Sequence, residues 1–183
     1  MTLVKALVGE VGRNQAPLAR WLGRLPGPFF EGEDLRNFAL WLHILGAATW
    51  FGANVAQAVI GTKLMRDNAA APGWLRAVER SSGPIYGTAA VVILATGIYL
   101  VLGSDGAYSF GSVFVGIGIA ILIVLGAMGG LVFGRKTKQM IALFDSGKAS
   151  EVPSVYRSLS SFGILDTVLL AVAVLAMVSK WGA

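Results

Sequence analysis

Residues 38–62 read FALWLHILGAATWFGANVAQAVIGT, and this segment contains no Asp, Glu, Lys or Arg. It is long enough to cross a bilayer as a helix, because about 20 residues suffice. Six of its residues follow one another at spacings of four and three, which places them on one helical face: His43, Ala47, Trp50, Asn54, Gln57 and Gly61. We call these six the polar stripe. Because His, Asn and Gln are costly in lipid, the stripe is expected to face protein, a cofactor or water.

The composition of the whole chain is that of a membrane protein. Of its 183 residues, 55% are hydrophobic and only 14% are charged, whereas a soluble domain averages about 25% charged residues. The apolar residues fall into four blocks, each of spanning length: residues 38–62, 83–103, 113–134 and 159–180. The sequence therefore predicts an all-α transmembrane fold, a four-helix up-down-up-down bundle over residues 38–183 with the lipid bilayer as its solvent.

Residues 1–37 are expected to form a separate N-terminal tail. Within it, Leu18, Trp21, Leu22 and Leu25 share one helical face, and Pro26 follows directly. This pattern favours a short interfacial helix that lies on the membrane surface. A tail without regular structure is the alternative.

The distribution of basic residues predicts the orientation. The loops 63–82 and 135–158 hold nine Lys and Arg residues, whereas the loop 104–112 holds none and the C-terminal end has only Lys180. Basic loops stay on the cytoplasmic side, so both termini are expected outside a bacterial cytoplasmic membrane. The basic residues of the N-terminal tail favour the reverse. Since the loops account for the net charge of +5, no nucleic-acid partner is expected.

The inventory of reactive side chains excludes several kinds of chemistry. The chain has no Cys and one His, which rules out disulfides, thiolate metal sites and multi-histidine sites within one chain. It also lacks a paired-carboxylate, HExxH or nucleophile motif. We therefore name no catalytic residue and no metal ligand, and we favour a protein that is not an enzyme.

Small residues in the third block predict close helix packing. Gly126, Gly130 and Gly134 form a small-xxx-small ladder, which lets two backbones approach closely in lipid. The facing helix could belong to the same chain or to another copy. In the second block, Ser82 is expected to cap the helix, with Pro84 in its first turn.

Counting helical rise from the helix ends places the polar side chains in two layers. The inner layer holds Asn54, Gln57, Thr88, Asp166 and Thr167. There Asp166 is either a neutral carboxyl that joins helices or a proton-transfer group. The outer layer holds His43 at the level of Tyr99 and Thr96. His43 is either a haem or copper ligand, a proton-transfer group, or a neutral side chain hydrogen-bonded to Tyr99 or a backbone carbonyl.

The stretch LWLHILGAATWFGANVAQAV, with His43, Trp50, Gly52 and Ala53 at its centre, resembles the first helix of a superfamily of small bacterial four-helix membrane proteins. That superfamily includes copper-resistance D proteins, HemJ-type protoporphyrinogen oxidases and a family of predicted integral membrane proteins without assigned function. The last is the closest likeness, since SGPIYGTAAVVILATGIYLVL and LLAVAVLAMVSK also resemble its second and last helices.

The resemblance implies a four-helix fold and makes His43 a candidate haem-site residue. Tyr99, which the depth count places at the same level, is the second candidate. HemJ-type proteins carry a Tyr-Leu-Pro-Arg stretch and further histidines, where this chain reads ANVAQAVIGTKLMRD without a second His. The oxidase activity is therefore not carried over.

Three functions follow as hypotheses. The leading one is a non-enzymatic accessory or scaffold subunit that works through helix–helix contacts, as a homo-oligomer or in a larger membrane complex. The first alternative is a haem b-binding redox or haem-handling protein that uses His43. The second is a small proton-coupled transporter that uses Asp166.

Overall fold

A computed structural model of the chain describes residues 32–67 and 69–182, so the expected interfacial helix at residues 18–25 lies outside the described residues. The described part contains four helical segments long and apolar enough to cross a membrane. They are α2 (Gly32–Leu64), α3 (Ala71–Leu102), the run from α4 (Val113–Met128) through η1 (Gly129–Gly134) to α5 (Arg135–Asp145), and α6 (Val152–Ser179), which follows the short η2 (Ala149–Glu151). The all-helical transmembrane class expected from the sequence is confirmed.

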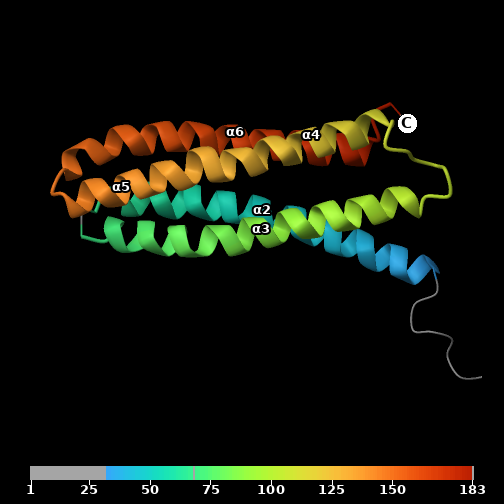
Figure 1. Ribbon diagram of the computed structural model, residues 1–183, viewed down its shortest axis with the longest axis horizontal. Helices are drawn as coiled ribbons and strands as arrows, with labels where there is room; N and C mark the ends of the chain where they lie inside the picture. Colours follow the sequence, from blue (N-terminus) through green and yellow to red (C-terminus); the bar gives the residue numbers. More distant parts are fainter. Residues whose placement is uncertain (1–31, 68, 183) are drawn as a thin grey trace, which may run out of the picture. The chain divides into compact units, whose positions relative to one another are not determined.

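The chain divides into two compact units, Met1–Phe38 and Ala39–Ala183. In the first, the described residues are the opening turns of α2. In the second, consecutive long helices run in opposite directions (Figure 1). Two contacts agree with the antiparallel arrangement of α2 and α3. His43 near the start of α2 contacts Thr96 near the end of α3, and Gly61 near the end of α2 lies beside Trp74 near the start of α3.

The second span belongs to a longer helix than expected, and the predicted cap at Ser82 is wrong. α3 begins at Ala71, with Pro72 in its first turn, and Pro84 lies inside the helix. The Ser82 hydroxyl donates to the Val78 carbonyl four residues earlier, as a serine inside a helix does. A proline inside a membrane helix is tolerated where neighbouring groups satisfy the backbone.

The third span changes its helical geometry at its glycines. The α-helix gives way to a π-helix over Gly129–Gly134 and resumes as α5, so the helix continues beyond the apolar block 113–134. A π-turn inside an α-helix is rare and often marks a functional position.

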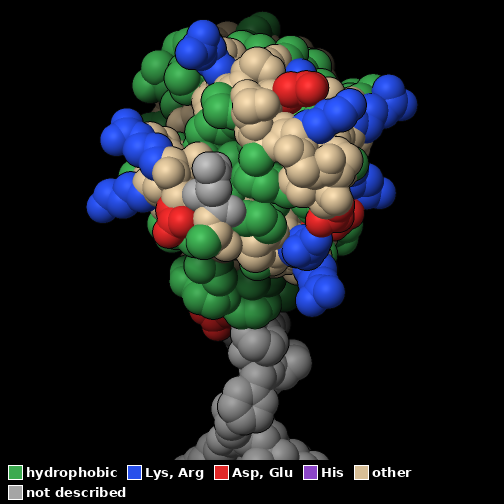
Figure 2. Space-filling view, turned by 90° about the vertical axis from the view of Figure 1, so that its left-hand side faces the viewer, with side chains coloured by type: hydrophobic (Ala, Val, Ile, Leu, Met, Phe, Trp, Pro, Cys, Tyr) green, Lys and Arg blue, Asp and Glu red, His purple; other side chains and the backbone are tan. Residues whose placement is uncertain are grey.

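Three apolar clusters stabilise the second unit at three levels. The middle cluster centres on Trp50, Ala89, Leu125 and Leu170, one from each long helical segment. A second cluster, Leu75, Met140 and Val152, lies in parts of α3, α5 and α6 outside the apolar blocks of the sequence, and a third, Phe114, Val115 and Ala176, lies at the opposite end. Figure 2 shows Lys and Arg side chains around the rim of the end that carries the α2–α3 and α5–α6 connections.

Candidate functional site, an intramembrane polar network

The polar stripe of α2 faces the rest of its unit. His43 contacts Thr96 of α3, Trp50 is 3% exposed, and a Cβ added to Gly61 would lie 2.8 Å from the Tyr156 hydroxyl of α6. The opposite face of α2 exposes large apolar side chains, among them Ile44, Phe51, Val55 and Val59. This division is what a helix at the edge of a membrane bundle requires, because only the inward face can satisfy polar groups.

The centre of the stripe forms a hydrogen-bonded network with α3 and α6. Asp166 of α6 is 5% exposed, and its Oδ2 accepts from Trp50 Nε1 at 3.4 Å and from Asn54 Nδ2 at 3.3 Å. The Tyr86 hydroxyl of α3 donates to Asn54 Oδ1 at 2.9 Å and accepts from Gln57 Nε2 at 2.8 Å. We call these five residues the Asp166 network. It places two amides, a phenol, an indole and a carboxyl in contact at one depth.

Two groups are outside what sequence reasoning assigned to this layer and yet are central to it. Trp50 was counted in the polar stripe but not in the inner layer, and it is both buried and a donor to Asp166. Tyr86 was not singled out, although its ring also packs edge-to-face on Trp50 with centroids 5.4 Å apart. The tyrosine itself was a signal in the sequence, because a buried tyrosine hydroxyl needs a hydrogen-bond partner. In the structure that partner is Asn54.

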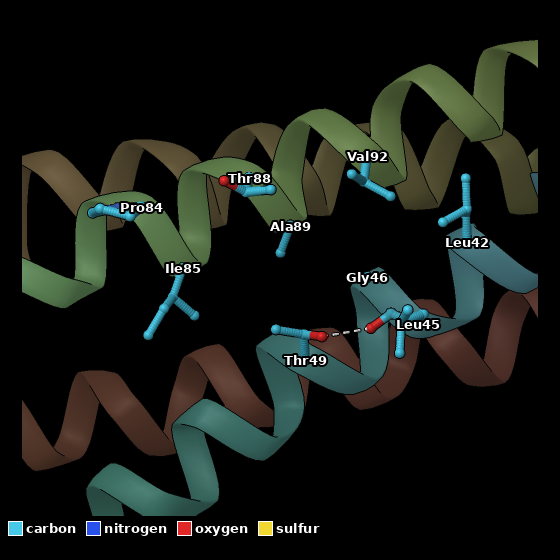
Figure 3. A pocket seen from close by; sticks show the side chains of 9 residues that line it. All are labelled: Leu42, Leu45, Gly46, Thr49, Pro84, Ile85, Thr88, Ala89 and Val92. Atoms are coloured by element: carbon cyan, nitrogen blue, oxygen red, sulfur yellow. Dashed lines mark hydrogen bonds between the residues drawn. The ribbon is translucent and has the colours of Figure 1, made fainter.

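The two threonines predicted for the inner layer do not belong to the Asp166 network. The Thr167 hydroxyl donates to the Gly163 carbonyl in its own helix. Thr88 lines an apolar groove of about 400 Å³ between α2 and α3 (Figure 3). The groove is bordered by Leu42, Leu45, Gly46, Thr49, Pro84, Ile85, Thr88, Ala89 and Val92. A short hydroxyl side chain can bond to its own helix backbone, as Thr167 does, so a shared depth alone does not bring it into the network.

The outer layer joins His43 of α2 to one part of α3. His43 Nδ1 lies 3.0 Å from Thr96 Oγ1, and a Cβ added to Gly97 would lie 3.2 Å from the imidazole Cε1. Thr96 in turn donates to the Val92 carbonyl. The histidine therefore contacts the turn of α3 that precedes Tyr99, whose own side chain is exposed. Among the described residues, no group of three or more His, Cys, Asp or Glu could hold a metal ion.

Among the described residues, the glycines at positions 126 and 130 of the ladder have open space where a side chain would project. A Cβ added to Gly126 or Gly130 would meet no atom within 4 Å among the described residues, and one added to Gly134 would meet only the Gly129 carbonyl oxygen. Gly126 and Gly130 are exposed. α4 instead packs on α6 through other positions, such as Gly118 against Met177. The ladder thus presents small residues on an uncovered face.

The four apolar helices define the class of this molecule: it is an integral membrane protein with four helical segments long and apolar enough to cross the bilayer. The chain matches the family described as "Predicted integral membrane protein (DUF2269)" over residues 37–181, and it belongs to that family. It is the family of predicted integral membrane proteins that the first, second and last helices resemble in sequence. No curated protein and no solved structure matches the chain.

Proposed function

We propose that this protein is a non-enzymatic accessory or scaffold subunit that binds partner helices within the membrane. The observation that supports the proposal is the exposed face of α4 and η1, where Gly126 and Gly130 have no neighbour within 4 Å of an added Cβ. Between membrane helices there is no hydrophobic driving force, so association depends on the close approach that small residues allow. A face of this kind lets the backbone of a second helix approach closely.

The same face is bordered by side chains that would pack around an incoming helix. Ile123 is 67% exposed and Leu131 is 57% exposed, one on each side of the glycines along the helix. The π-turn at Gly129–Gly134 lies at this face. We infer that a second copy of the chain or a helix of a larger complex covers it, with the basic end on the cytoplasmic side.

Site-specific photo-crosslinking in native membranes tests the proposal. A photoreactive residue at Ala127 should give a discrete protein adduct, whereas one at Val91, which is 67% exposed on α3, should react with lipid. Gly126→Ile and Gly130→Ile should abolish the Ala127 adduct because the added side chains hold the partner backbone away. Gly52→Ile is the matched control, since Gly52 of α2 is also exposed and has no neighbour within 4 Å of an added Cβ.

The mass of the adduct separates the two kinds of partner. Twice the chain mass indicates self-association, and another reproducible mass indicates a complex with a different protein. Lipid adducts alone at Ala127, or a protein adduct that survives both isoleucine substitutions, would refute the proposed contact.

A further inference from the structure

The carboxyl group of Asp166 is satisfied on one side only. Its Oδ2 accepts two hydrogen bonds, whereas the buried Oδ1 has no hydrogen-bond partner among the described residues. A carboxylate has about four lone-pair positions, and a buried acceptor without a donor is costly. An unpartnered oxygen on a side chain that is 5% exposed therefore indicates a site that can bind a further atom or ion.

The donors on the other oxygen are all oriented toward the carboxyl. Gln57 donates to the Tyr86 oxygen, Tyr86 donates to the Asn54 oxygen, and Asn54 donates to Asp166. Aligned hydrogen bonds of this kind polarise one another, so the Asn54 amide becomes a stronger donor to Oδ2. The Oδ2 side of the site is thus suited to a carboxylate, while the Oδ1 side, buried and without a donor, is suited to the neutral acid.

Within the part of the chain that the structure describes, no salt bridge joins Asp166 to a cation. The segments α4 and η1, which pack on α6, have no titratable side chain between Val113 and Gly134, and the first basic residue that follows is Arg135 of α5. α3 contributes the Tyr86 phenol, with Arg80 six residues before it, and α2 contributes His43 seven residues before Trp50. The nearest basic residues on α2 and α6, Lys63 and Arg157, are each nine residues from Asn54 and Asp166, or about 13 Å along the helix.

A metal ion is a poor fit for the unpartnered oxygen. Hard cations require several oxygen ligands, and the amide oxygen of Asn54 is already used by Tyr86. Within residues 32–67 and 69–182, no other carboxylate joins Asp166 in a group that could hold a metal. A proton needs one lone pair, which is what Oδ1 offers.

We propose that Asp166 is a reversible proton-binding site inside the hydrocarbon layer, and that its protonation weakens the hydrogen bonds that join α6 to α2. Binding converts the carboxylate to the acid with one new O–H bond at Oδ1. The proton comes from water and returns to it on release. A neutral acid accepts more weakly than a carboxylate, so Trp50 and Asn54 lose part of their attachment to α6 on protonation.

Infrared spectroscopy of the purified chain in phosphatidylcholine vesicles tests the site. The carbonyl stretching band of a protonated carboxyl should be present at low pH and lost as the pH rises, with the expected shift in heavy water. Asp166→Asn should remove this band, whereas Glu79→Gln, which changes an exposed carboxyl of α3, should leave it. An Asp166-dependent band that persists at every pH, or that never appears, would overturn the proposal.

Two further variants keep the carboxyl and test the role of its donors. Trp50→Phe removes one direct donor, and Tyr86→Phe removes the hydroxyl that polarises Asn54. Both should make the band persist to higher pH, with the larger change for Trp50→Phe, because the carboxylate loses stabilisation. Identical titration curves for both variants and the native chain would overturn the link between protonation and these hydrogen bonds. This test is independent of the α4 partner face, so either proposal can fail alone.

Discussion

Replacing Asp166 with leucine should loosen the bundle by about 1 kcal/mol. The substitution removes the acceptor of two hydrogen bonds, from Trp50 at 3.4 Å and from Asn54 at 3.3 Å. Hydrogen bonds between membrane helices average about 0.6 kcal/mol, and both of these are long, so two of them give about 1 kcal/mol. Asp166→Asn should cost less than about 0.5 kcal/mol, because one amide oxygen can accept both bonds.

The free energy of unfolding can be measured by steric trapping in mixed micelles, with helical circular dichroism as a second signal. Val168→Leu is the control, since Val168 lies on the same helix and is 52% exposed. The reasoning is refuted if Asp166→Leu is as stable as the native chain, because the network would then contribute nothing to packing. It is also refuted if Asp166→Asn is as destabilising as Asp166→Leu, since the acceptor would then be irrelevant.

Three more predictions follow from the packing, the charges and the histidine. Gly46→Ala should lower the free energy of unfolding by about 1–3 kcal/mol through overpacking, because its Cβ would lie 2.9 Å from a side chain of α3; Gly52→Ala, whose Cβ meets nothing within 4 Å, should show no such loss in the same assay. In intact cells, a cysteine at Ser146 should be shielded from a membrane-impermeant thiol reagent and one at Gly106 should react, as the basic loops predict; the opposite pattern would invert the orientation. If the chain binds haem b, the purified protein should show a Soret band that His43→Ala abolishes, and a colourless protein from haem-supplemented cells would exclude this alternative.

The inward face of α2 was predictable from the sequence because polar side chains inside a membrane almost always face protein or water. A helix of spanning length with His43, Asn54 and Gln57 on one face has to turn that face away from lipid. Side-chain spacing alone therefore predicts the rotation of the helix. The four spans were equally accessible, since length and apolar composition are sufficient evidence for a membrane helix.

Partner choice was not predictable in the same way. Depth along a helix gives one coordinate of a side chain, so Thr88 and Asn54 share a level although one faces a groove and the other faces Asp166. Short-range self-satisfaction of threonine hydroxyls competes with long-range bonding, and the outcome depends on the rotation of each helix. The start of α3 at Ala71 was missed because Pro84 was interpreted as a beginning, whereas Pro72 has that role.

The different levels of the bundle are stabilised by different forces, and this explains why the polar network lies where it does. Leu75, Met140 and Val152 are buried outside the apolar blocks of the sequence, where burial from water stabilises the contact of α3, α5 and α6. Inside the lipid this driving force is absent. Turning α2 by one residue, about 100°, would point Asn54 at lipid and leave Asp166 without its direct amide donor. Packing opposes the same turn, because Trp50 is buried in the middle cluster and Gly46 lies close to a side chain of α3. The hydrogen bonds of the Asp166 network and these close contacts therefore set the rotation of the helix together.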